Sequence, residues 1–96
     1  MVATSAILDQ VTEELHISED DLIRKSLYSY LERQLRLIQT EIFEIITRYN
    51  VANTEEFEKR YREGTLEEAA SWRDYQRLDH LEYKQGQIRK LLDSLS

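Results

Sequence analysis

Few side chains in this sequence have the types and spacing that catalysis or metal binding requires. Glu13 and His16 are three residues apart, which is the acid-to-imidazole spacing of helical di-metal sites. Such sites need two of these motifs and two further glutamates, but the other histidine, His80, follows Arg77 at this spacing. We therefore expect His16 to end a helix and His80 to lie on the surface.

The composition excludes several classes of catalytic and cofactor site. The chain has no cysteine, and therefore no thiol nucleophile, disulfide or cysteine-ligated zinc. Its two glycines cannot form the glycine clusters of Rossmann or P-loop nucleotide sites. No Ser-His-Asp or glycine-elbow signature is present either. We predict that the protein is not an enzyme and that it holds no metal and no cofactor.

The charge balance limits the class of partner. Lys and Arg total 13 and Asp and Glu total 19, for a net charge of −6, and no basic residue precedes Arg24. Nucleic-acid binding needs clustered cations. The cluster at residues 59–62, Lys-Arg-Tyr-Arg, is expected to pair with acids of its own helix rather than with RNA. We predict no nucleic-acid binding by the protein alone; the acidity fits a basic protein partner, or it serves only solubility.

The elements that position these residues are predicted to be helices. Absence of proline and the presence of only two glycines nearly exclude an all-β fold. Ser18, Asn53 and Thr65 are N-cap residues followed by acids, and Gly64 ends the helix before Thr65. These signals predict a single all-α domain over residues 1–96, with helices at about 5–15, 19–49, 54–63 and 66–95. The two long helices would each span about 45 Å.

Both long helices carry apolar residues at heptad spacing. A two-helix hairpin leaves one side of each such seam exposed, which soluble monomers avoid. We therefore expect each chain to contain two long and two short helices. Two copies of the chain are expected to associate as a dimeric antiparallel helical bundle, so that the protein's partner is a second copy of itself. The predicted dimer or core seam consists of Leu31, Leu35, Ile38, Ile42, Ile45, Leu78, Leu81, Ile88 and Leu92.

Aromatic residues of the last helix are candidate contacts for another protein. Trp72, Tyr75 and Tyr83 belong to the residue types that dominate binding hot spots. The alternative, a place in the core of the bundle or dimer, is the more frequent role for such residues. Gly86, beside the polar Gln85, marks either a close helix contact or a soft point in the helix.

The turn Leu15-His16-Ile17-Ser18 is followed by a helix that opens with Leu22-Ile23 and continues to Tyr30-Leu31-Glu32. In these features residues 8–35 resemble the helix–turn–helix part of ribbon-helix-helix proteins, small dimeric DNA-binding regulators that include many antitoxins. The DNA-reading strand of that family precedes its first helix, whereas residues 1–4 here are too few for it and hold no Lys or Arg. The resemblance thus implies dimerising helices without the DNA-binding surface. His16 stands where the family usually has glycine, and histidine tolerates the left-handed conformation.

The remainder of the chain, between residues 48 and 82, is similar to small acidic helical prokaryotic proteins encoded beside putative toxins. The resemblance implies a neutralising partner. The sequence therefore predicts an antitoxin-like interaction protein that occludes a basic protein partner through acidic amphipathic helices. The alternatives are a DNA-binding regulator of ribbon-helix-helix type and a purely structural dimeric scaffold.

The expected location is the cytoplasm, without membrane contact. Residues 1–6 have no basic residue ahead of an apolar run, as a signal peptide would have. The apolar runs are far shorter than the roughly 20 residues that span a bilayer. Absence of cysteine also fits a reducing compartment.

Overall fold

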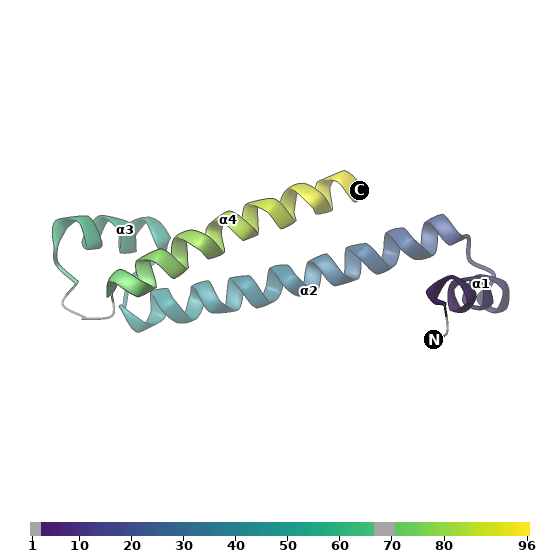
Figure 1. The fold of residues 1–96 in the computed structure, drawn as a ribbon. Coiled ribbons are helices and arrows are strands. Elements are labelled where there is room, and N and C mark those ends of the chain that lie inside the picture. Colours follow the sequence, from purple (N-terminus) through teal and green to yellow (C-terminus); the bar gives the residue numbers. More distant parts are fainter. Residues whose placement is uncertain (1–2, 67–70) are drawn as a thin grey trace.

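Four helices make up the fold, which a computed structural model describes for residues 3–66 and 71–96 (Figure 1). They are α1 (Thr4–Leu15), α2 (Glu19–Arg48), α3 (Thr54–Glu63) and α4 (Ser71–Leu95), and the described residues form no strand. The all-α prediction is confirmed. Within the same ranges no helix has the length and apolar content needed to cross a membrane.

The helix boundaries follow from local capping chemistry. The side chain of Ser18 accepts a hydrogen bond from the Asp21 backbone N–H at 3.1 Å, and that of Asn53 accepts one from the Glu56 N–H at 2.8 Å. Gly64 ends α3 with φ +71°, the left-handed conformation that glycine adopts without strain. These three predicted caps are confirmed. The predicted capping box at residues 65–68 extends beyond the described residues, and the expected helical start at residue 66 is irregular in the structure.

The two long helices form an antiparallel hairpin (Figure 1). At its open end, Nη1 of Arg24 in α2 donates to the backbone carbonyl of Leu95 in α4 at 2.9 Å. Nearer the closed end, Arg77 of α4 donates two hydrogen bonds to the Glu41 carboxylate of α2, each 2.9 Å long. Such bidentate pairs fix geometry as well as contributing energy. The two contacts define the antiparallel register.

The best-buried part of the core lies at the closed end, where α3 covers the hairpin. Phe57 of α3 has no exposed surface. Its ring meets that of Tyr49 edge to face at 4.9 Å and stacks on Tyr75 at 6.4 Å. A single aromatic residue thus joins α2, α3 and α4. The buried apolar residues are Ile38, Ile42, Ile45, Tyr49, Phe57, Leu78 and Leu81.

The predicted seam residues lie along this hairpin within one chain. Five of them are buried: Ile38, Ile42, Ile45, Leu78 and Leu81. Four are half-buried: Leu31, Leu35, Ile88 and Leu92. The heptad pattern therefore marks the face that each long helix turns to the other, and burial is greatest where α3 also contributes.

Replacement of the two phenylalanines by alanine tests the position of the core. Phe57→Ala removes a fully buried ring and should lower the free energy of unfolding by about 3–5 kcal/mol. Phe43→Ala is the matched control, because Phe43 is 64% exposed in a single chain, and its cost should be much smaller than that of Phe57→Ala. Chemical denaturation measures both. Equal losses would contradict the assignment of Phe57 to the centre of the core.

Candidate functional site

The two histidines considered for metal or acid–base chemistry lie apart, His16 at the end of α1 and His80 on the surface of α4. His16 ends α1 with φ 54° and ψ 46°, and its backbone N–H donates to the Thr12 carbonyl. The expected left-handed turn at His16 is thus confirmed. His80 is exposed on α4. In the described part of the chain no group of three or more His, Cys, Asp or Glu side chains is arranged to hold a metal ion.

Three residues of the basic cluster at 59–62 contact neighbouring side chains of α3 and α4. The ring of Tyr61 stacks on that of Tyr75 at 4.4 Å with an interplanar angle of 15°, so this face is not open to a nucleic-acid base. Two arginines of the cluster approach glutamates one turn earlier at 3.8 Å: Arg60 with Glu56, and Arg62 with Glu58.

The three aromatic residues predicted as partner contacts do not form one surface. Tyr75 is half-buried in the stack with Phe57 and Tyr61, where it extends the core. Trp72 and Tyr83 are exposed on α4, 55% and 66% respectively. They are separated by about 16 Å of helix at 1.5 Å per residue. They therefore lie on separate parts of α4.

An apolar groove lies between α1 and the first turns of α2. It has a volume of about 370 Å³, and six of its eight lining residues are aliphatic. Neither wall is closed over, since Ile7 of α1 is 50% exposed and Leu27 of α2 is 47% exposed. In Figure 1, α2 extends past the end of α4, and α1 lies at this free end. The lining residues are Thr4, Ile7, Leu8, Val11, Leu22, Ile23, Ser26 and Leu27.

Helical spacing and the connecting turn explain why this groove forms. The lining positions of each helix recur at three- and four-residue intervals, which place them on one face. The left-handed His16 and the Ser18 cap stop one helix and start the next within three residues. The Ile17 backbone N–H also donates to the Thr12 carbonyl at 3.2 Å. The turn therefore brings the two aliphatic faces toward each other.

The whole net charge of the protein lies at this end of the chain. Residues 1–21 hold six acidic and no basic residues, whereas residues 22–96 hold 13 of each sign. We call residues 3–21 the acidic end and residues 22–96 the hairpin region; the groove is lined by residues of both. The acids are Asp9, Glu13, Glu14, Glu19, Asp20 and Asp21.

None of the groove residues was predicted as a site from the sequence. The signal is present, because aliphatic residues at helical spacing stand on both sides of the Ser18 cap. Periodicity identifies an apolar face but not whether another part of the chain covers it. Only the structure shows that no other described part of the chain covers the apolar faces of the groove.

The chain belongs to the uncharacterized protein MJ0235 family. The match extends over residues 1–96, so it includes both the acidic end and the hairpin region. No curated protein and no solved structure matches the chain.

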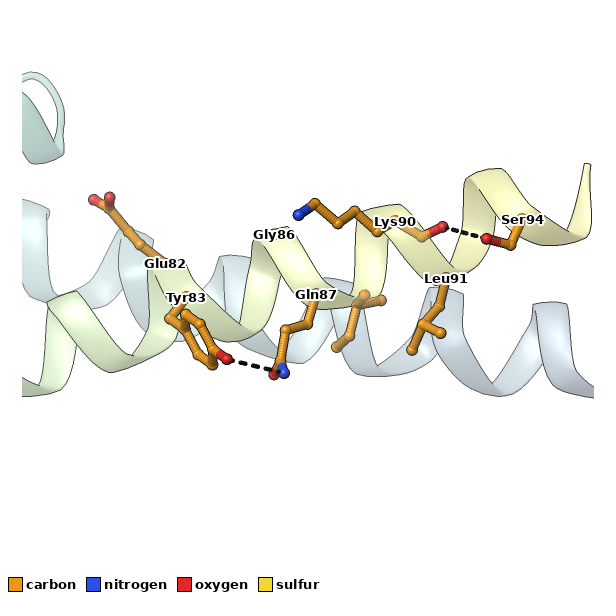
Figure 2. Close-up of a pocket in the computed structure, with 8 residues that line it drawn as sticks. Glu82, Tyr83, Gly86, Gln87, Lys90, Leu91 and Ser94 are labelled. Carbon is orange, nitrogen blue, oxygen red and sulfur yellow. Dashed lines mark hydrogen bonds between the residues drawn. The ribbon is translucent and has the colours of Figure 1, made fainter.

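A second hollow of this MJ0235 family member lies on the outer side of α4 (Figure 2). Its volume is about 690 Å³, and all its lining residues belong to α4. Tyr83 and Gln87 are joined by a hydrogen bond of 3.4 Å, and the Ser94 hydroxyl donates to the Lys90 carbonyl at 3.0 Å. The polar groups pair along the helix instead of converging on a common point. The hollow is thus an open side of one helix.

Gly86 lies at the middle of this hollow. A Cβ atom placed on Gly86 would meet nothing within 4 Å, so no close helix contact within the chain requires glycine here. Of the two roles considered from the sequence, a close helix contact is therefore not made within a single chain, and the soft point stays a prediction. Glycine inside a helix costs stability because the unfolded chain has more conformations to lose.

Alanine substitution at the two glycines should give opposite effects. Gly86→Ala should raise the free energy of unfolding by about 0.5–1 kcal/mol, because α4 keeps its shape and the unfolded chain loses freedom. Gly64→Ala should lower it by about 1 kcal/mol or more, because φ is +71° there. Thermal melting measures both. A loss of stability in Gly86→Ala would show that something packs closely against α4 at this position.

Proposed function

We propose that this protein is a non-enzymatic, antitoxin-like interaction protein that binds a basic protein partner with its acidic end. The separation of charge carries the proposal: six acids and no cation lie in residues 1–21, and the rest of the chain is neutral overall. A concentrated negative field steers a basic partner toward one end of the molecule and orients it there. The partner would be inhibited by occlusion of its working surface.

The polar contacts of the hairpin region support a binding role. The Asp74 carboxylate accepts hydrogen bonds from the Tyr49 hydroxyl and from Arg48, and Glu41 pairs with Arg77. Among the described residues no buried side-chain polar atom lacks a hydrogen-bond partner. These groups hold helices together and do not converge on a cavity. These contacts leave the apolar groove and the acids beside it available for recognition.

We also propose that the protein is a homodimer formed through the hairpin region. This region carries no net charge, so charge does not oppose its association with a second copy. It also exposes large apolar side chains, among them Leu37, Phe43 and Leu91, that a second copy would cover. A two-fold dimer of this kind leaves both acidic ends free for partners.

Two variants with the same net charge test the role of the acidic end. Each lowers the net charge from −6 to −3 by three isosteric changes. The first is Asp9→Asn with Glu13→Gln and Glu14→Gln in α1; the control is Glu44→Gln with Asp79→Asn and Asp93→Asn in the hairpin region. Wild type and control should capture the same proteins from the native host, and the α1 variant should lose them. The captured proteins should be basic and should elute with salt. Equal capture by both variants, or loss only with the control, would contradict the proposal.

Sedimentation equilibrium tests the dimer. Wild type should have a mass twice the 11.5 kDa of one chain. Of the single variants Leu37→Glu, Phe43→Glu and Leu91→Glu, at least one should sediment as a folded monomer, because a charge would be buried in the interface. The α1 charge variant should remain dimeric. A compact wild-type monomer at micromolar concentration would overturn the dimer, and three dimeric variants would move the interface away from the hairpin region.

A further inference from the structure

We infer that the groove between α1 and α2 is the binding site for a basic amphipathic helix of the partner. This inference rests on the proposed function and specifies where and how the partner is held. Its basis is the coincidence of three features at one end of the molecule: an open aliphatic groove, two helical walls and an excess of acids.

The groove has the form of a helix-binding site. Its walls are single faces of two helices, and its volume of about 370 Å³ lies in the range of binding pockets. α1 contains 12 residues, and none of them is buried. At 1.5 Å per residue, α1 presents about 18 Å of wall, which matches about three turns of an incoming helix. A third helix would bury the two open faces together.

The incoming segment must supply its own backbone hydrogen bonds. Apart from Thr4, the first residue of α1, the groove residues lie where the main-chain groups are paired within the helices or with their cap residues. The groove therefore offers no strand edge to which an extended peptide could add. An amphipathic helix satisfies its own backbone and presents aliphatic side chains at the matching spacing.

An acidic residue lies beyond the lining residues of each wall of the groove. Glu14 is seven residues after Ile7, and Glu19 is seven residues before Ser26, so each lies nearly in line with a lining residue of its own helix. The nearest cation in sequence, Arg24, points elsewhere: it lies 3.6 Å from Asp20 and donates to the Leu95 carbonyl. The flanks of the groove thus favour Lys and Arg on the polar face of the bound helix.

Charge also decides against a second copy as the occupant. A two-fold interface places the same patch of each chain against itself. Two acidic ends would then bring six acids and no cation from each copy together. The same repulsion disfavours the anionic surface of a membrane. A basic helix is the occupant that satisfies both the apolar lining and the charge.

A pair of synthetic peptides tests the inference with the full-length protein. Both contain about 14 residues of leucine and lysine in equal composition. One has leucine at helical spacing along one face, and the other has the order scrambled so that no apolar face forms. By calorimetry the amphipathic peptide should bind at least tenfold more tightly, and circular dichroism should show a gain of helix on binding.

Matched variants locate the site. Ile7→Ala with Leu27→Ala should weaken binding of the amphipathic peptide at least tenfold, whereas Leu37→Ala with Leu91→Ala, equally exposed in the hairpin region, should change it less than twofold. Because the groove variant loses apolar surface, its helix content is checked first. A second pair avoids this concern: Glu14→Gln with Glu19→Gln should weaken binding more than Asp9→Asn with Glu13→Gln, which makes the same charge change on the other side of α1.

The possible outcomes separate the two proposals. Equal binding of both peptides would overturn the groove as a helix site but leave the acidic end as the partner surface. Failure of both peptides to bind would overturn both proposals. A fall in the mass of the unliganded protein on changing Ile7 and Leu27 would show that a second copy occupies the groove, which also overturns the inference.

Discussion

The burial of Phe57 between the two long helices organises the molecule. Its ring, with those of Tyr49 and Tyr75, seals the closed end of the hairpin and connects α3 to both α2 and α4. Burial decreases with distance from this point: Leu31 and Ile88 are half-buried, and none of the residues of α1 is buried. Because three helices meet at one end only, the other end keeps an apolar face without a cover.

The polar contacts across the hairpin use acids and cations of the hairpin region in equal numbers. Asp74 with Arg48, and Glu41 with Arg77, combine opposite charges from different helices. Such pairs contribute little stability when exposed, but their geometry fixes the register of α2 against α4. Residues 1–21 contain six acids and no cation, and Asp20 pairs only along its own helix, with Arg24 at 3.6 Å. The charges that join the two long helices are therefore different residues from the acids of the acidic end.

Local features of the structure could be predicted from the sequence, and long-range ones could not. Caps such as Ser18 and Gly64 depend on a few neighbouring residues, and the pattern of Ile38, Ile42 and Ile45 marks a face whichever helix covers it. Arg48 of α2 lies 2.9 Å from Asp74 of α4, a contact between residues 26 positions apart that no local pattern indicates. Tyr75, predicted as a partner contact, stacks on Tyr61. Phe57 was missed because a short helix such as α3 gives little periodicity. The groove was missed because an exposed apolar face and a covered one have the same sequence pattern.

The weak attachment of α1 is consistent with a role in recognition. α1 packs against α2 alone among the described helices; on the groove side Ile7 is 50% exposed, and Leu8 and Val11 are only half-buried. Elements with few buried contacts open at the lowest free energy, and binding elements are commonly drawn from them. The groove residues Leu22 and Ser26 lie on a different face of α2 from the seam residue Ile38, because 16 and 12 residues of helix rotate them by about 160° and 120° from it. A bound helix would therefore cover a face of α2 that α4 does not reach.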